Sequence, residues 1–381
     1  MRDERKLVLH LLYRLDTGGL EQVLLDTVRE LSSDFQHVVV SLTTASPNLR
    51  SQLPRDVAVY ELKKRGGHAP DVWFKVYSLL RRLKPDVLHS YNISCLEFQA
   101  IAFLARVPLR LHAEHGRSAG DPDGKNRRHR WLRRRMRFFV HSWITVSRDL
   151  YDWLCVDIGL PESSVALIYN GVDTTKFASI PLDSLPNSVR TLSGFCDKNA
   201  FVVGTVGRLD PVKNHEVLIE AWAMLLKANP SASDNMVLVI VGGGALEEHL
   251  RNVIVRKGLE SSVLLAGEHS NIALLMARFN LFVLPSIAEG LPMTLLEAMS
   301  SAKPVIASRV GGIPELVTSD TGSLLVPSDC DALMQEILSW SQDDELRSIA
   351  GFAARKRVLD HFGIDSMIQG YALEYSQGEN Y

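Results

Sequence analysis

The sequence predicts an α/β protein with two doubly wound parallel-sheet domains that face each other across a cleft. The chain has 381 residues, which is too long for one ordinary hydrophobic core and fits two domains. Short β-branched runs alternate with longer helical patterns along both halves, and this alternation is typical of parallel sheets with helices on both faces. Ligands bind beyond the carboxyl ends of the strands in such sheets, so the cleft is the expected site.

The first half carries the pattern of one such domain, expected over residues 1–175. Apolar β-branched runs predict seven strands, and periodic apolar positions predict helices between most of them, for example at residues 20–31, 71–83 and 148–158. The expected strands are residues 7–13, 37–42, 57–62, 86–89, 109–113, 143–146 and 165–169.

The second half repeats the plan over residues 200–362. An Asn-Gly pair, two prolines and several serines interrupt the alternation at residues 170–200, so residues 176–199 are expected to link the two domains. Residues 363–381 are expected to form a C-terminal helix that packs back on the first domain. The expected strands are residues 201–206, 236–241, 263–266, 281–285 and 304–307, with helices at 215–226, 246–257, 272–279 and 292–300.

Composition excludes several classes of protein. The net charge of −2 and the hydrophobic content of 46% indicate a globular protein without a global preference for nucleic acid or membrane. The four cysteines stand apart without a CxxC pair, which indicates free thiols and argues against structural zinc. No run reaches the ~18–20 apolar residues that a membrane span needs, and the N-terminal stretch fits a first strand better than a signal peptide. We therefore expect a cytoplasmic location.

The loop at residues 207–215 (GRLDPVKNH) predicts an anion site. It follows the apolar strand FVVGTV and places Arg208 and Lys213 before a helix whose N-terminal amides also attract anions. A basic, solvated loop is the alternative interpretation. The position at the carboxyl edge of a strand favours function.

Two glycine clusters and one histidine follow other strands. Gly242 and Gly243, within a glycine triplet, precede a helix and would let the backbone approach a ligand closely, although glycines in such turns are common. Gly18 and Gly19 follow the first strand with the same ambiguity. They lack the GxGxxG spacing, which argues against a nicotinamide-dependent dehydrogenase. His115 follows the fifth strand, where a catalytic role competes with a purely structural one.

Residues 286–300 (SIAEGLPMTLLEAMS) place two glutamates eight positions apart. Glu289 lies in the loop after a strand, and Glu297 lies about one and a half turns into the helix that Pro292 can begin. Two such carboxylates can accept hydroxyl hydrogen bonds from two parts of one long polar ligand. The alternative is one capping acid and one surface acid, but the apolar neighbours of Glu297 are unusual for a solvated side chain.

These features together resemble the GT-B glycosyltransferases, specifically the large retaining family with the signature E-x7-E. Glu289 and Glu297 match that spacing, and residues 207–214 match the diphosphate-binding loop of the family. Residues 112–126 and 170–173 are similar to a bacterial branch of sugar transferases associated with exopolysaccharide and exosortase loci. The resemblance covers nearly the whole chain and implies two Rossmann-like domains.

The resemblance also implies roles for individual residues. Arg208 and Lys213 would hold the diphosphate of a nucleotide-sugar donor, Glu289 the hydroxyls of the transferred sugar, and Glu297 the ribose. The remaining implied site residues are His115 beside the reacting sugar, Gly18 and Gly19 near the phosphates and the acceptor, and Gly242, Gly243, Gly290 and Leu291 around the donor. The implied reaction is a retaining, metal-independent hexosyl transfer to a saccharide or lipid-linked acceptor.

Three other functions are compatible with parts of the pattern. A metal-dependent transferase would use an Asp-x-Asp motif, and Asp121 and Asp123 match it, but their glycine-rich surroundings favour a turn. A sugar-nucleotide epimerase would share the diphosphate and ribose sites but would isomerise the donor. A non-catalytic two-domain binding protein would release its ligand unchanged.

Residues 125–140 (KNRRHRWLRRRMRFFV) form the one strongly basic segment. The segment holds eight Lys and Arg residues and no acid, and helical spacing places Leu132, Met136 and Phe139 on one face. Arg127, Arg130, Arg134 and Arg137 fall largely on another. A basic amphipathic helix of this kind suits an anionic membrane surface, which arginines 133–135 would contact. The alternative is a helix packed on its own domain, and a nucleic-acid partner is not expected.

Overall fold

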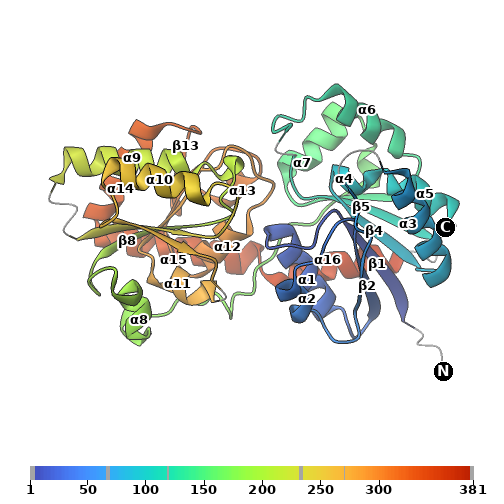
Figure 1. Cartoon of the computed structure of the whole chain (residues 1–381), viewed down its shortest axis with the longest axis horizontal. Coiled ribbons are helices and arrows are strands. Elements are labelled where there is room, and N and C mark those ends of the chain that lie inside the picture. Colours follow the sequence, from blue (N-terminus) through green and yellow to red (C-terminus); the bar gives the residue numbers. More distant parts are fainter. Residues whose placement is uncertain (1–4, 66–68, 118–119, 231–234, 270, 378–381) are drawn as a thin grey trace. The chain divides into compact units, whose positions relative to one another are not determined.

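The computed structural model describes residues 5–65, 69–117, 120–230, 235–269 and 271–377 (Figure 1). The chain divides into two compact units. Unit 1 is Met1–Asn170 with Asp365–Tyr381, and unit 2 is Gly171–Ile364. Each unit is built on its own parallel sheet, which confirms the predicted fold class.

Unit 1 contains seven strands in the order β3-β2-β1-β4-β5-β6-β7, and all neighbouring pairs are parallel. Its strands are β1 (Lys6–Leu12), β2 (Phe35–Ser41), β3 (Ala58–Glu61), β4 (Val87–Tyr91), β5 (Leu109–Glu114), β6 (Ser142–Thr145) and β7 (Val165–Leu167). Its α-helices are α1 (Gly19–Glu30), α2 (Pro47–Gln52), α3 (Pro70–Leu83), α4 (Ile93–Leu96), α5 (Phe98–Leu104), α6 (Arg127–Met136), α7 (Arg148–Asp152) and α16 (Ile364–Ser376), and a π-helix covers Trp153–Ile158.

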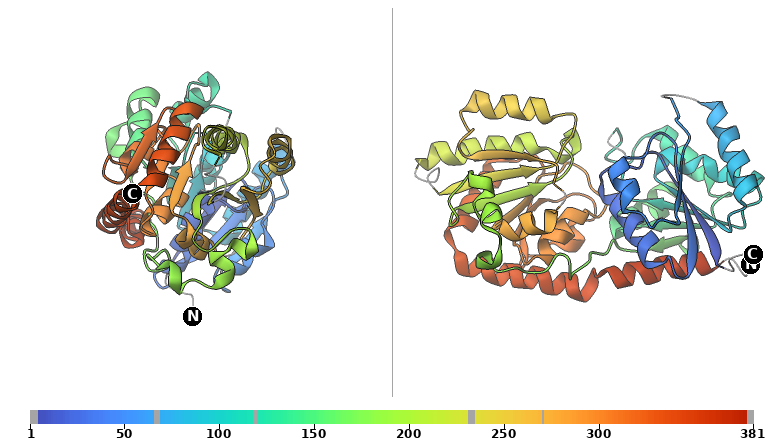
Figure 2. Two further views of the ribbon diagram at one scale, coloured as in Figure 1. Left: turned by 90° about the vertical axis from the view of Figure 1, so that its left-hand side faces the viewer. Right: turned by 60° about the horizontal axis from the view of Figure 1, so that its bottom comes forward.

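The two faces of the unit 1 sheet have different chemistry because successive side chains of a strand point to opposite faces. Leu9 and Leu11 of β1 belong to an apolar core that includes residues of α3 and α5. His10, between them, belongs to a buried histidine–tyrosine cluster that α16 covers: its Nδ1 lies 2.9 Å from the Tyr91 hydroxyl, and Nδ1 of His89 lies 2.8 Å from that of Tyr375. The C-terminal helix α16, which runs along unit 1 in Figure 2, is therefore fixed to this unit by specific polar contacts.

Unit 2 contains six parallel strands in the order β10-β9-β8-β11-β12-β13. Its strands are β8 (Phe201–Val206), β9 (Met236–Val241), β10 (Val263–Gly267), β11 (Leu281–Leu284), β12 (Val305–Ser308) and β13 (Gly322–Leu325). Its α-helices are α8 (Asn187–Arg190), α9 (His215–Ala228), α10 (Glu247–Lys257), α11 (Ile272–Arg278), α12 (Met293–Ser300), α13 (Ile313–Leu316), α14 (Cys330–Gln342) and α15 (Asp344–His361).

Helices cover both faces of the unit 2 sheet. Residues of α9, α10 and α14 share one apolar core with alternate residues of β8, β9 and β11, while α11, α12 and α15 lie on the opposite side of the sheet (Figures 1 and 2). At Gly204 of β8 an added Cβ would lie 2.2 Å from the Phe279 ring, so a side chain of any size is excluded there. Both faces are thus closed, and the carboxyl edge of the sheet remains for a ligand.

Three details differ from the sequence-based expectation. Strand β13 was not predicted, because its four residues begin with glycine and lack a β-branched side chain. The division between the units falls after Asn170 rather than after residue 175. The expected linker, residues 176–199, belongs to unit 2, where the buried Arg278 guanidinium donates hydrogen bonds to the carbonyls of Arg190 and Ala200.

Candidate active site

The strand orders place two candidate sites, one in each unit. The chain adds strands first toward one edge of the sheet and then toward the other, and this strand order reverses between β1 and β4 in unit 1 and between β8 and β11 in unit 2. In doubly wound sheets, ligands bind at such reversals, outside the carboxyl ends of the strands. The loops that follow these four strands contain Gly18, Asn92, Arg208, Lys213 and Glu289, and Gly19 is the first residue of α1.

The loop after β8 is folded by one aspartate. Oδ1 of Asp210 accepts hydrogen bonds from the amides of Val212 and Lys213, at 3.1 and 3.2 Å, and so caps the 3-10 turn that contains Lys213. Nη2 of Arg208 lies 3.3 Å from Oδ2 of the same aspartate, while the Arg208 side chain remains 65% exposed. Asp210 therefore organises both basic residues of the predicted anion site.

Lys213 and Glu289 form an ion pair that joins the loops after β8 and β11. Lys213 Nζ donates to Glu289 Oε1 at 2.6 Å, and the Ser286 hydroxyl donates to the same oxygen, also at 2.6 Å. Both charged side chains are largely buried. An ammonium group has three donors and this pair uses one, so Lys213 retains donors for an anionic ligand.

Backbone contacts hold the glycine-rich loops of unit 2 together. Gly242, with φ of +137°, approaches the Gly207 carbonyl so closely that an added Cβ would lie 2.0 Å from the oxygen. A Cβ added at Gly311, which has a φ of +52°, would likewise lie 2.0 Å from the carbonyl oxygen of Glu289. The amide of Ile287 donates to the Val212 carbonyl at 2.8 Å. These glycines therefore serve the mutual packing of the site loops.

The second glutamate of the predicted pair lies in α12, directly after the Glu289 loop. Glu297 is 9% exposed and stands among buried residues of the helix. Leu291 is buried before the helix begins, and the carbonyl of Gly290 accepts a hydrogen bond from the Gly312 amide at 2.8 Å. The structure thus brings the Glu289 loop, Gly290, Leu291 and Glu297 together on one strand–loop–helix segment.

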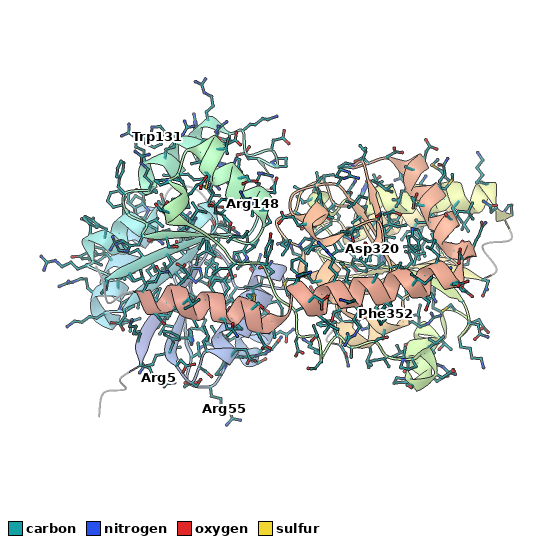
Figure 3. The ribbon with its side chains drawn as sticks, turned by 180° about the vertical axis from the view of Figure 1, so that it is seen from behind. Arg5, Arg55, Trp131, Arg148, Asp320 and Phe352 are labelled. Atoms are coloured by element: carbon teal, nitrogen blue, oxygen red, sulfur yellow. The ribbon has the colours of Figure 1, made fainter. Side chains whose placement is uncertain are left out.

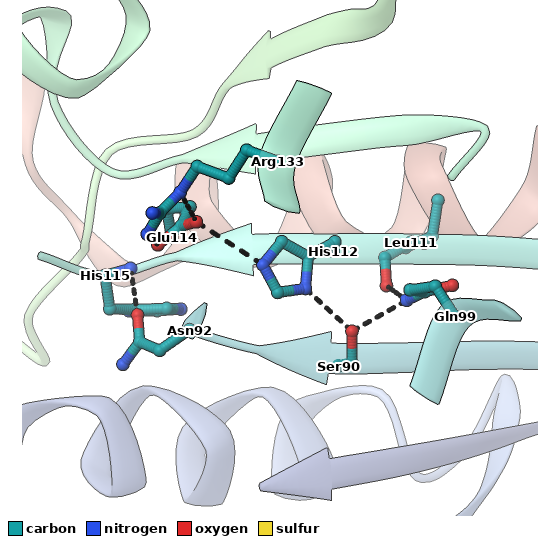
Figure 4. A network of polar contacts seen from close by, with 8 residues as sticks. All are labelled: Ser90, Asn92, Gln99, Leu111, His112, Glu114, His115 and Arg133. Atoms are coloured by element: carbon teal, nitrogen blue, oxygen red, sulfur yellow. Dashed lines mark hydrogen bonds and ion pairs between the residues drawn. The ribbon is translucent and has the colours of Figure 1, made fainter. Parts of the chain in front are cut away.

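His115 follows β5 in unit 1. Its backbone amide donates to Oδ1 of Asn92, the residue after β4, at 2.8 Å (Figure 4). Both ring nitrogens are shielded from solvent and lack a hydrogen-bond partner among the described residues. Burial lowers the pKa of His115 to about 4, so the ring is neutral at pH 7. Gly18 and Gly19, after β1, lie at the N-terminus of α1.

A buried polar network supports this edge of unit 1 (Figure 4). Nε and Nη2 of Arg133 donate to the two carboxylate oxygens of Glu114, at 2.6 and 3.1 Å. Nε2 of His112 lies 3.5 Å from Glu114, and its Nδ1 lies 2.7 Å from the Ser90 hydroxyl. Burial opposes ionisation of Glu114, but Arg133 and His112 outweigh it and lower the pKa to about 2.

The network corrects one expectation about the basic segment. Arg133 was expected at a membrane surface, but it is 2% exposed because Glu114 draws it into unit 1. Arg130 and Arg134 donate to backbone carbonyls of the following π-helix, of Asp157 in both cases and of Ile158 for Arg134. The helix is also shorter than the biased segment, because α6 ends at Met136.

The outer side of the segment remains exposed. Trp131 is 58% and Phe138 68% exposed, and Figure 3 shows Trp131 at the outside of unit 1. Arg135 stacks on Trp131 and Arg137 on Phe138, with the guanidinium carbon 5.6 and 4.8 Å from the ring centroid. We call this the α6 surface, defined by the exposed residues Arg127, Arg128, Trp131, Arg135, Arg137 and Phe138.

Asp121 and Asp123 belong to a turn. The Gly124 amide donates to the Asp121 carbonyl at 3.0 Å, and the Asp121 carboxylate accepts from the Asn126 amide at 2.9 Å. Asp123 is exposed near Lys125. Within the described ranges, no group of three or more His, Cys, Asp or Glu side chains is placed to hold a metal ion.

Sequence reasoning missed two residues and one ion pair of these sites. Ser286 received no role, although a hydroxyl three residues before a loop glutamate is a local signal. Asn92 and the Glu114–Arg133 pair gave no such signal, because their partners lie 23 and 19 residues away.

Comparison with known proteins identifies the class. The description "Glycosyl transferases group 1" matches residues 194–357, and "Glycosyltransferase Family 4" matches residues 17–176. Together the two matches span most of both units. The chain belongs to the glycosyltransferases, with a family 4 domain followed by a group 1 domain, and this result confirms the resemblance in the sequence.

Individual relatives agree with the class. An Escherichia coli protein named UDP-Gal:alpha-D-GlcNAc-diphosphoundecaprenol alpha-1,3-galactosyltransferase is 29% identical over 76% of this chain and 74% of its own. The lipopolysaccharide core mannosyltransferase LpsB of Rhizobium meliloti is 28% identical over 55% of this chain and 60% of its own length. The Anabaena protein Alr3699/HepE, solved with UDP and glucose, has a TM-score of 0.82 at 24% identity, covering 97% of this chain and 99% of that chain. The last likeness shows the shared GT-B fold.

The helices give one further finding. Among the described residues, no helix is long and apolar enough to cross a membrane.

Proposed function

We propose that this protein is a retaining glycosyltransferase that moves a hexose from a nucleoside-diphosphate donor to a lipid-linked saccharide in bacterial surface-glycan synthesis. The observation that carries the proposal is the Lys213–Glu289–Ser286 cluster at the strand reversal of unit 2. Negative charge develops on the departing diphosphate as the glycosidic bond breaks. A fixed cation at this position stabilises that charge more in the transition state than in the ground state.

The proposal assigns a role to each candidate site residue of unit 2. Lys213 and Arg208 bind the diphosphate, and the Gly242–Gly243 backbone lies beside the donor. Glu289, with Gly290 and Leu291, contacts the transferred sugar, and Glu297 contacts the ribose hydroxyls. Ser286 holds Glu289 in position through its 2.6 Å hydrogen bond.

Unit 1 contributes uncharged groups. His115 lies beside the reacting sugar, where a neutral imidazole can donate or accept one hydrogen bond without adding charge. Gly18 and Gly19 offer the N-terminal amides of α1 to the donor phosphates and the acceptor. No metal is required in this scheme, because Arg208 and Lys213 supply the positive charge that a bridging ion would supply.

The relatives support the choice of substrates. The Escherichia coli relative is named for a UDP-galactose donor and a diphosphoundecaprenol-linked acceptor, and its alignment spans both units. A lipid-linked acceptor places the enzyme at the inner face of the cytoplasmic membrane. We therefore infer a cytoplasmic, peripherally bound enzyme.

The α6 surface is the proposed membrane contact. It combines exposed arginines with two exposed aromatic rings, which suit the charged and interfacial layers of an anionic bilayer. Replacing Arg127, Arg128 and Arg135 by Gln should weaken binding to phosphatidylglycerol vesicles at low salt, by about 1 kcal/mol per arginine. The matched control is the Gln triple at Arg251, Arg256 and Lys257 of α10, also exposed in the structure. Equal binding by both triples would contradict the assignment.

The function is tested by a donor screen. Nucleoside-diphosphate hexoses are incubated with the protein, with and without N-acetylglucosaminyl-diphosphoundecaprenol, and each incubation is run both with and without EDTA. Acceptor-dependent release of nucleoside diphosphate is expected. An isomerised donor without release would indicate the epimerase, and full recovery of every donor would indicate a binding protein. Activity that EDTA abolishes and Mn²⁺ restores would contradict metal independence.

A further inference from the structure

Asn92 adopts a backbone conformation that side chains avoid. It follows β4 with φ of +56° and ψ of 168°, a region populated almost entirely by glycine. Such backbone strain persists only where the surrounding structure fixes it. The position lies at the strand reversal of unit 1, where a ligand is expected.

The surroundings of Asn92 do fix its backbone. Its amide donates to the Ala113 carbonyl at 2.8 Å, and its carbonyl accepts from the Cys95 amide at 3.0 Å. The preceding residue, Tyr91, is buried, and its hydroxyl lies 3.0 Å from His89 in the histidine–tyrosine cluster. The strained conformation is thus held from both sides along the chain.

The Asn92 side chain is directed away from its usual partner. Asparagine at a helix N-cap normally accepts a hydrogen bond from an amide in the first turn of its own helix. Asn92 is the N-cap of α4 but makes no such bond, and its Oδ1 accepts instead from the His115 amide, 2.8 Å away on the neighbouring strand loop. Figure 4 shows its amide nitrogen turned away from His115, so the contact uses the oxygen alone.

We propose that Asn92 is a positioning residue for glycosyl transfer, which fixes the His115 backbone and thereby the ring beside the reacting sugar. The inference rests on the proposed function, because it assigns His115 to the reacting sugar. The centroid of the Tyr91 ring, at the end of β4, lies 5.6 Å from that of the His115 ring. Asn92 therefore contacts the backbone of His115, and the preceding residue packs against its side chain. The strain and the missing cap of α4 are the structural costs of this placement.

Two substitutions separate positioning from stability. Asn92→Gly suits the backbone conformation and removes the oxygen, so the variant should be at least as stable as the parent. Its kcat should fall about tenfold to hundredfold with little change in the donor KM, because a misplaced group slows the chemical step rather than donor binding. Asn92→Asp keeps an acceptor oxygen and should recover most of the lost kcat. A purely structural residue could not give a stable but slow variant.

A second readout does not depend on activity. The full chain is labelled with ¹⁵N-histidine, the His115 amide is assigned from the spectrum of His115→Gln, and its hydrogen exchange is measured. Slow exchange is expected in the parent and in Asn92→Asp, and faster exchange in Asn92→Gly, which lacks the acceptor.

The outcomes distinguish the two proposals. If the parent transfers no sugar from any donor, the proposed function fails and takes the positioning role with it, while the exchange data still decide whether Asn92 holds His115. If the parent is active, parental kcat in Asn92→Gly overturns the positioning role. Parental protection of the His115 amide in Asn92→Gly overturns the contact on which it rests.

Discussion

The two units share one architecture, but their candidate sites differ in the charge of the side chains that form them. In unit 2 the site consists of charged side chains, Arg208, Lys213 and Glu289, on loops held together by close glycine contacts. In unit 1 the corresponding edge has a neutral histidine and a strained asparagine above a buried network. A charged donor needs fixed charge, whereas an acceptor hydroxyl and a sugar ring need neutral groups in fixed positions. The difference fits a division between donor binding and the placement of reacting groups.

The ion pairs of the two units sharpen this comparison. The Glu114–Arg133 pair of unit 1 is fully buried, so removing one partner leaves an uncompensated charge. Glu114→Ala should lower the free energy of unfolding by about 3–5 kcal/mol. The measurement is urea unfolding, with Glu247→Ala, which breaks the exposed Glu247–Arg251 pair on α10, as the control of ~0.5 kcal/mol or less. Similar losses in the two variants would mean that the network does not support unit 1.

The Lys213–Glu289 pair should behave in the reverse way. Lys213→Ala should reduce kcat by about 10²–10³, the usual effect of removing one electrostatic stabiliser of a transition state. It should lower stability less than Glu114→Ala does, because the Lys213–Glu289 pair is more exposed than the Glu114–Arg133 pair. Lys257→Ala breaks a Lys–Glu pair of similar length, 2.7 Å to Glu220, away from the site and serves as the control. Near-parental turnover of Lys213→Ala would remove the diphosphate site from unit 2.

The glycines provide a third contrast. An alanine Cβ at Gly242 would lie 2.0 Å from the Gly207 carbonyl, at a φ that alanine avoids. Gly242→Ala should therefore destabilise the protein by about 1–3 kcal/mol. Gly18 has extended backbone, and its added Cβ would meet only the Glu21 carboxyl group, which can rotate away. Gly18→Ala should change the unfolding free energy by less than ~0.5 kcal/mol, as measured by urea unfolding. Equal effects would contradict the loop packing described for unit 2.

The site residues of unit 2 could be predicted from the sequence more completely than those of unit 1. The unit 2 residues are recognisable because Arg208, Lys213, Glu289 and their glycines lie in short loops directly after apolar strands. The strain at Asn92 could not be predicted, because a positive φ at asparagine depends on contacts with distant residues. The burial of Arg133 could not be predicted either, because nothing in the local sequence distinguishes it from the seven other Lys and Arg residues of the same segment.

Acid should affect unit 1 more than unit 2. Burial lowers the pKa of His37 and His115 to about 4, and that of His10 and His89 well below the usual 6.5; His215 of unit 2 also falls to about 4. Below pH 6.5 the unfolded chain binds protons that these buried rings do not, so stability decreases from pH 6.5 towards pH 4. Hydrogen exchange at pH 7 and pH 5, corrected for intrinsic rates, should reveal larger losses of protection in unit 1. Uniform loss in both units would contradict the assignment.

The division between donor binding and reaction is tested most directly by calorimetric titration of the nucleoside diphosphate that the donor screen identifies. Lys213→Ala should weaken this affinity, because the role proposed for Lys213 is to bind the diphosphate itself. His115→Ala should bind the nucleoside diphosphate as tightly as the parent, since the ligand lacks the sugar, yet turn over the complete donor more slowly. Parental affinity in Lys213→Ala, or an equal loss of affinity in both variants, would contradict the proposed division between the two units.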